Sequence, residues 1–375
     1  MIVEGESRRA VANTADFGGA LEASGAVYVG TLPDEIGLSN TAFEWEGRRW
    51  SMVLWPLPDD PPVRRALLLH EAWHRVQPQL GFDAPLVENG HLARESGRVW
   101  LRLEWRALRR ALDSEDAARR EAVADALLFR ARRHALHPGA REDETALELN
   151  EGLAQYTGDR LGHGREVAVA AAAALDRAEQ ADAFARSFAY ATGPAWGILL
   201  DDLAPGWRRQ IGPGVGFGDL AAAALEAVWP PTEVEGAADA RAAEYGLAEV
   251  AAEESARADA HRRERERLLD TLVRRPALVL PLRQMQMQFD PNAVTPLPPH
   301  GSVYRRITIQ DSWGEVEVSA GALLAADFTS LALPGTARLD GRNLTAEGWT
   351  LRLAEGWGVE REEEGGWRLA PPPSP

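Results

Sequence analysis

The chain contains no cysteine and no lysine, and each absence excludes a kind of chemistry. Without cysteine there are neither disulfides nor thiolate ligands, so any bound metal ion must be held by imidazole and carboxylate groups. Without lysine the protein has no Schiff-base lysine mechanism, because arginine stays charged and cannot replace the amine. The exclusive use of arginine among basic residues is typical of a GC-rich bacterial genome.

Long apolar runs and an excess of positive charge are also absent. No stretch approaches the roughly 18 apolar residues of a membrane-spanning helix, and Arg8 and Arg9 are not followed by the apolar segment of a secretory signal. We therefore expect no membrane span and a cytoplasmic location, although a secreted precursor trimmed of its signal would look the same. The formal net charge of −16 argues against partners such as nucleic acid or an anionic membrane.

Residues 1–62 are expected to form a small β-rich segment. A strand is predicted at 26–30, and a hairpin within 41–57 turns at Glu46 and Gly47. The second hairpin strand, Trp50 to Leu54, could pair with an extended substrate by β-addition. Asp60, followed by Pro61, favours a helix start, because aspartate can cap the free N–H groups and proline suits the first turn.

Residues 63–275 have the apolar spacing of helices. The predicted helices cover residues 63–76, 97–112, 117–135 and 144–161, and the charged stretch 237–275 reads as one long helix or two. At Pro276 the pattern changes to short alternating strands between turns, as in Gln284 to Phe289, and predicts a separate β domain, sandwich or barrel, over residues 276–375. The fold class is therefore α+β.

The chemistry begins at His70-Glu71-Ala72-Trp73-His74, within the first predicted helix. Positions i and i+4 share one helix face, so His70 and His74 can reach a single zinc ion. Glu71 lies beside them without taking a coordination position. Zinc lowers the pKa of a bound water to about 7, and Glu71 could accept the proton as a general base.

A hydrolytic zinc ion needs a third protein ligand and one open position. The extended form with a third histidine, His-x-x-Gly-x-x-His after the motif, is missing. Glu151, in Asn150-Glu151-Gly152-Leu153-Ala154-Gln155-Tyr156, is the stronger candidate. Glu148, three residues earlier on the same predicted helix, is the alternative.

The Asn-Glu-Gly-x-Ala-x-Tyr pattern resembles the third-ligand helix of the aminopeptidase-N-like zinc peptidases, the gluzincin group. A second segment, Tyr190-Ala191-Thr192-Gly193, is similar to the Tyr-x-x-Gly segment of that family. The resemblance implies a mainly helical, zincin-like catalytic domain that binds one zinc ion through His70, His74 and Glu151. It also implies that Tyr190 is a catalytic residue, which donates a hydrogen bond to the developing oxyanion.

Two features depart from the family. The 76 residues Arg75 to Asn150 separate His74 from Glu151, where the family has a short connection, so we expect a helical insertion that returns the chain to the site. The Gly-x-Met-Glu-Asn segment, which holds a substrate's free amine, is not found upstream of His70. Peptide hydrolysis therefore fits the motifs better than aminopeptidase specificity.

The sequence predicts a zinc metallopeptidase acting on peptides or proteins. The alternatives are a catalytically inactive, peptidase-like binding protein and a zinc hydrolase with a non-peptide substrate. Among other polar residues, His163 fits a loop histidine better than a ligand. Glu104 and Arg106 could support the site from the inserted helices, but a salt-bridged helix face explains them better.

Overall fold

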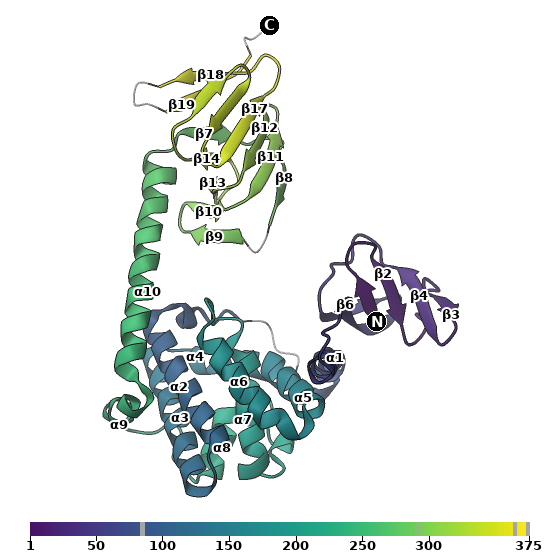
Figure 1. Ribbon diagram of the computed structural model, residues 1–375, viewed down its shortest axis with the longest axis vertical. Coiled ribbons are helices and arrows are strands. Elements are labelled where there is room, and N and C mark those ends of the chain that lie inside the picture. Colours follow the sequence, from purple (N-terminus) through teal and green to yellow (C-terminus); the bar gives the residue numbers. More distant parts are fainter. Residues whose placement is uncertain (83–86, 291–292, 363–365, 373–375) are drawn as a thin grey trace. The chain divides into compact units, whose positions relative to one another are not determined.

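The computed structural model describes residues 1–82, 87–290, 293–362 and 366–372. The chain forms two compact units, residues 1–256 and 257–375. The first combines an N-terminal sheet with helices, and the second consists mainly of strands (Figure 1). In the described part of the chain, no helix has the length and apolar character that crossing a membrane requires.

The N-terminal sheet is six-stranded in the order β3-β4-β2-β1-β6-β5. Its strands are β1 (Ile2–Glu4), β2 (Arg9–Ala12), β3 (Glu22–Ser24), β4 (Val27–Thr31), β5 (Thr41–Trp45) and β6 (Arg48–Trp55). The predicted hairpin is confirmed as β5 and β6, which pair antiparallel, while β1 pairs with β6 in parallel. The expectation that Trp50 to Leu54 receives a substrate strand is wrong, because β6 already has a neighbour on each side. The edge strands are β5, next to β6, and β3 at the far end.

In the part of the first unit that the structure describes, the helices follow the sheet with no further strand between them. They are α1 (Pro61–Val76), α2 (Glu95–Asp113), α3 (Asp116–Leu136), α4 (Ala140–Leu147), α5 (Leu153–Gly162), α6 (Val167–Glu179), α7 (Phe188–Leu203), α8 (Phe217–Ala224) and α9 (Glu235–Ala242); α10 (Leu247–Leu268) follows. Short helical turns join them: η1 (Gln77–Leu80), η2 (Gly90–Ala93), η3 (Glu148–Gly152), η4 (Gly164–Glu166), η5 (Trp207–Arg209), η6 (Ala243–Tyr245) and η7 (Leu269–Arg274).

The start of α1 follows the proline signal but not the predicted cap. Pro61 occupies the first turn, where its missing N–H costs nothing. The Asp60 side chain makes no capping hydrogen bond, and only its backbone carbonyl accepts from the Arg64 N–H. The prediction that Asp60 caps the helix through its side chain is therefore wrong.

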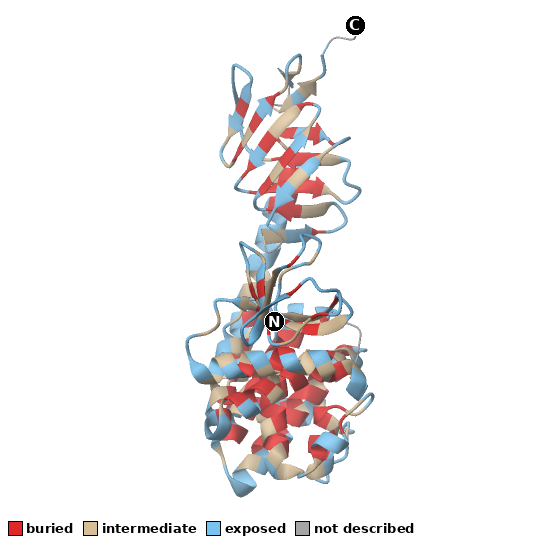
Figure 2. Ribbon diagram, turned by 90° about the vertical axis from the view of Figure 1, so that its right-hand side faces the viewer, coloured by how far each residue is buried: buried red, intermediate tan, exposed pale blue. Residues whose placement is uncertain are grey.

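Two predicted helices differ from the observed ones. Residues 144–161 contain α4, the π turn η3 and α5, instead of one regular helix. Residues 237–275 divide into α9 and α10 with further turns, which agrees with the two-helix alternative. The core of the first unit lies among α2, α3, α6 and α7, where Trp105, Phe129, Phe188 and Trp196 are fully buried (Figure 2).

The second unit contains two sheets that share one apolar core. One has the order β18-β19-β7-β14-β13-β10-β9, and the other β15-β16-β17-β12-β11-β8. The strands are β7 (Leu278–Pro281), β8 (Gln286–Phe289), β9 (Val294–Leu297), β10 (Gly301–Tyr304), β11 (Ile307–Asp311), β12 (Gly314–Val318), β13 (Ala322–Ala325), β14 (Ser330–Leu333), β15 (Arg338–Asp340), β16 (Asn343–Ala346), β17 (Trp349–Leu353), β18 (Gly358–Arg361) and β19 (Trp367–Ala370). Alternating buried residues of both sheets meet in this core, which is the arrangement of a sandwich.

Candidate metal centre

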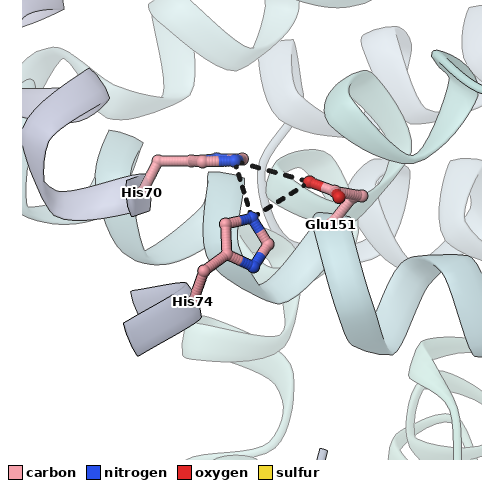
Figure 3. Close-up of side chains that lie close together, drawn as sticks. All are labelled: His70, His74 and Glu151. Atoms are coloured by element: carbon pink, nitrogen blue, oxygen red, sulfur yellow. Dashed lines mark hydrogen bonds and ion pairs between the residues drawn. The ribbon is translucent and has the colours of Figure 1, made fainter. Parts of the chain in front are cut away.

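The two motif histidines project from one face of α1 toward Glu151 of η3 (Figure 3). The Nε2 atoms of His70 and His74 are 3.0 Å apart. Glu151 Oε2 lies 3.4 Å from His70 Nε2 and 3.2 Å from His74 Nε2. Three possible ligand atoms thus form a small triangle, although His74 and Glu151 are 77 positions apart in the sequence.

The size of this triangle fits a shared zinc ion. Ligand atoms about 2.0–2.1 Å from zinc in tetrahedral geometry lie about 3.3 Å from one another, and the observed separations are 3.0–3.4 Å. Two imidazoles and one carboxylate are also a ligand set that zinc accepts at hydrolytic sites. In the described residues, His70, His74 and Glu151 are the one group of three or more metal-binding side chains that converges in this way.

The π turn η3 explains why Glu151, and not Glu148, faces the histidines. Residues three apart in an α-helix are about 60° apart around the axis, whereas a π turn, at roughly 80° per residue, separates them by about 120°. Glu148 accordingly points the other way, is fully buried, and accepts hydrogen bonds from Arg130. Burial raises the pKa of Glu148 in spite of the Arg130 charge.

Small residues let α5 approach α1 closely enough to bring Glu151 to the histidines. A Cβ atom at Gly158 would lie 2.5 Å from the Ala66 carbonyl oxygen, and one at Gly162 would lie 2.7 Å from the Ala66 nitrogen. Both distances are too short for any larger residue without movement of the backbone. The glycines of α5 therefore fix the distance between the two helices that carry the proposed ligands.

A second close approach places Tyr190 beside the triangle. A Cβ atom at Gly193 of α7 would lie 2.4 Å from the Cα of Gly152, so the glycines of the two family-like motifs are in contact. The Tyr190 ring stacks on His70, with centroids 5.6 Å apart and planes 14° from parallel. Burial, the Glu151 charge and a hydrogen bond to Glu151 raise the pKa of Tyr190, so its hydroxyl stays a donor at neutral pH.

The carboxylates of Glu151 and Glu71 have opposite pKa shifts. Burial alone would raise the pKa of Glu151, but the neighbouring His70 and His74 side chains lower it, which keeps this carboxylate ionised. Burial raises the pKa of Glu71, against the smaller effect of the neighbouring histidines. Glu71 Oε2 is buried and has no hydrogen-bond partner in the described chain. Glu71 is thus a buried carboxylate beside the triangle with an oxygen free to accept a proton.

Gln77, which the sequence did not single out, orients His74. The Gln77 amide nitrogen donates to the carbonyl oxygens of Phe82 and Asn150, so its oxygen faces the His74 ring. His74 Nδ1 lies 2.8 Å from this oxygen and must carry the hydrogen. The Nε2 atom of the neutral ring then keeps its lone pair for the triangle, as metal-binding histidines require.

We expect Gln77→Leu to weaken zinc binding by about tenfold to a hundredfold, because loss of such an orienting partner lets the ring rotate and change tautomer. Competition with a fluorescent zinc chelator measures the change. Gln180→Leu, at an exposed position at the end of α6, is the matched control and should leave zinc affinity unchanged. Equal affinities of the two variants would contradict the orienting role.

Behind the π turn lies a buried cluster of charges, which we call the Arg–Glu network: Glu104, Arg130, Arg133, Glu144 and Glu148. Arg130 binds Glu104 and Glu148, and Arg133 binds Glu104 and Glu144, with distances of 2.5–2.9 Å. The predicted salt bridges of Glu104 are confirmed, but they lie in the interior and not on a solvated helix face, because Glu104 is fully buried. Arg106, which pairs with Glu179 at a partly exposed position, fits the predicted salt-bridged helix face.

The other histidines near these elements lie outside the triangle. His91 and His134 both contact Glu144 of the Arg–Glu network, at 2.6 and 2.9 Å. His163, at the end of α5, has its Nε2 atom 3.7 Å from Asp159 and takes no part in the triangle.

An open cavity of about 750 Å³ adjoins the triangle and is lined at one end by His70, Glu71 and Tyr190. A smaller cavity of about 240 Å³ contains all three triangle residues and is bordered by Thr41 and Ala42 of the edge strand β5. The site is therefore accessible to a ligand, and an unpaired strand edge runs beside it. Comparison of the chain with protein-family models, with curated proteins and with solved structures finds no match to any of them.

Proposed function

We propose that the chain is a zinc-dependent peptidase with a zincin-like catalytic unit, similar to the aminopeptidase-N-like gluzincins. One observation carries the proposal: three ligand atoms from two separate motifs lie 3.0–3.4 Å apart, next to an unpartnered buried glutamate and an open cavity. His70, His74 and Glu151 would hold the ion. Zinc would supply a Lewis acid that polarises the scissile carbonyl and acidifies water.

The residues of the chain supply the remaining steps. Glu71 accepts a proton from the attacking water as the water oxygen bonds to the carbonyl carbon. It then delivers this proton to the amine nitrogen as the carbon–nitrogen bond breaks. The Tyr190 hydroxyl, which stays protonated because its pKa is raised, exchanges its hydrogen bond to Glu151 for one to the negative carbonyl oxygen. Such a hydrogen-bond donor typically stabilises the transition state by about 3 kcal/mol.

The edge strand favours a peptide over other substrates. Among the described residues β5 pairs only with β6, so its outer N–H and C=O groups can pair with an extended chain. Thr41 and Ala42 border the cavity that holds the triangle. Addition of a strand to a sheet edge is a common mode of peptide binding. In this proposal the substrate pairs with β5, and not with β6 as the sequence had suggested.

Removal of zinc tests the proposal. We expect about one zinc ion per chain, loss of peptide hydrolysis on dialysis against a chelator, and recovery on addition of one equivalent of zinc. The measurements are metal analysis and cleavage of a library of quenched fluorescent peptides.

His70→Ala and His74→Ala should each fail to retain stoichiometric zinc, because an open catalytic site has only three protein ligands. His261→Ala, at an exposed position of α10, is the control. A zinc-loaded protein that cleaves no peptide would exclude the peptidase, and full zinc in either variant would refute the ligand assignment.

A further inference from the structure

The 750 Å³ cavity beside the proposed metal centre extends along α5 away from Glu151. Gln155, Asp159 and His163 follow Glu151 at intervals of four residues and line it in turn. Residues four apart lie one helical turn apart on neighbouring parts of the same face. Asp159 thus lies about 12 Å along the helix axis from Glu151, at 1.5 Å per residue.

Asp159 is a buried carboxylate whose negative charge is only partly compensated. Its side chain is 9 % exposed. Oδ1 accepts a hydrogen bond of 2.9 Å from Gln155 and lies 3.7 Å from His163 Nε2, while Oδ2 has no partner in the described residues. Burial raises the pKa of Asp159. A buried charge of this kind is costly unless a cation pairs with it, and the carboxylate borders an open cavity.

The walls near Asp159 are small and apolar. Leu67 of α1 and Ala170, Ala174 and Ala178 of α6 line the cavity, so they leave room for an aliphatic chain. Lysine and arginine side chains bury their methylene groups against such surfaces while the charged end reaches a polar partner. A substrate side chain that enters beside Glu151 must extend along about two turns of the helix to meet Asp159, which favours a long side chain such as lysine or arginine.

Arg177 of α6 also lines the cavity, at an exposed position. Its positive charge could attract an acidic substrate, which is the opposite of what Asp159 suggests. An exposed charge contributes little because water screens it, whereas the buried Asp159 interacts in a medium of lower effective dielectric. The net charge of −16 also favours approach of a cationic peptide.

We propose that this cavity binds a cationic side chain of the substrate, lysine or arginine next to the scissile bond, and that Asp159 is the residue that recognises it. The proposal rests on the peptidase function proposed above and assigns its substrate class. The Asp159 carboxylate pairs with the ammonium or guanidinium group, and the cavity walls hold the methylene stem.

The test compares Nα-acetylated peptides that carry arginine or its neutral isostere citrulline on either side of the scissile bond. For the wild-type protein we expect kcat/KM to favour arginine by about tenfold to a hundredfold, because one hydrogen-bonded charge pair is gained. In Asp159→Asn this ratio should fall to near one. Arg177→Gln should keep the ratio. Acetylation removes the free amine of the peptide. If peptides with a free N-terminus are preferred and acetylated ones show no preference for arginine, the site binds an N-terminal ammonium, and the side-chain assignment is overturned.

A binding measurement separates this proposal from the proposed function. Zinc-loaded Glu71→Gln protein is titrated with the arginine and citrulline peptides, with and without Asp159→Asn, by fluorescence anisotropy. Selective binding of arginine that depends on Asp159 would support the cavity assignment even if the wild-type protein cleaved no peptide. Equal binding of both peptides, a preference that survives Asp159→Asn, or an acidic preference that Arg177→Gln removes would each overturn it.

Ala174→Leu provides a second variant that leaves Asp159 in place. Ala174 lies on the α6 wall, and a larger side chain there narrows the cavity. The arginine-to-citrulline ratio should again fall toward one, with unchanged zinc stoichiometry as evidence of folding. An unchanged ratio in a folded Ala174→Leu protein would contradict binding of the side chain in this cavity.

Discussion

Glu71→Gln should retain one zinc ion per chain while losing peptide hydrolysis by a factor of about 10² to 10⁴, the usual cost of removing a general base. The amide keeps the size of the side chain but cannot accept the proton. Glu71 lies next to the ligand triangle without belonging to it, so the metal should stay bound. Metal analysis and kcat for a cleaved peptide, measured on the same preparation, check both parts of this expectation.

Glu233→Gln, in an exposed loop, is the matched control and should keep full activity. Two results would contradict the role of Glu71. A fully active Glu71→Gln protein would remove it from the mechanism, and a zinc-free one would make it a ligand instead of a base. The second outcome would also require a different explanation for the position of Glu151.

The local parts of the candidate site could be predicted from the sequence because they depend on helix geometry alone. His70 and His74 share a face of α1 since four residues make about one turn. The hairpin before the helix was evident from its alternating pattern and its turn at Glu46 and Gly47, both with positive φ.

The position of Glu151 could be predicted only through the motif resemblance. No periodicity relates residue 151 to residue 74 across an inserted helical hairpin. What brings them together is the contact of Gly158 with Ala66 and of Gly152 with Gly193. In the sequence, a glycine within a helix only indicates lower helix stability. That it permits close packing becomes evident only from the residues that contact it in the structure.

The buried charges could not be predicted from the sequence at all. Charged residues on a helix are usually exposed, so α2 and α3 read as amphipathic helices with solvated faces. Glu104, Arg130 and Arg133 are instead buried, because each finds its partner on another helix. The pairing of β1 with β6 was likewise not predicted, because a parallel neighbour from a distant part of the chain leaves no local signal in the sequence. β1 therefore occupies the edge of β6 where a substrate strand was expected.

The Arg–Glu network also links the stability of the fold to the geometry of the candidate site. Arg130 forms a bidentate ion pair with Glu148, and Glu148 is the first residue of the π turn that carries Glu151. Burial would raise the pKa of Glu144, but the Arg133 charge holds it well below its ordinary value. The arginines likewise lower the pKa of Glu104, so these two carboxylates are held ionised, and each buried group of the network depends on its partners for compensation.

We expect Arg130→Met to lower the free energy of unfolding of the metal-free protein by about 3–5 kcal/mol, because it leaves Glu148 buried without its cation. Zinc affinity should fall as well, since the π turn loses the contact that holds it. Urea unfolding followed by tryptophan fluorescence gives the first quantity, and chelator competition gives the second. Arg120→Met, the same substitution at an exposed position of α3, should change the unfolding free energy by less than about 0.5 kcal/mol.

The double variant Arg130→Met, Glu148→Met separates an uncompensated charge from lost packing. Replacing both members of a buried ion pair by apolar residues of similar volume is often neutral, whereas breaking the pair is not. Glu104 keeps its hydrogen bonds from Arg133 and Trp196 in either variant. We therefore expect the double variant to regain more than half of the stability lost in Arg130→Met. If the two substitutions are instead additive, the loss comes from packing, and the charge pair does not hold the π turn.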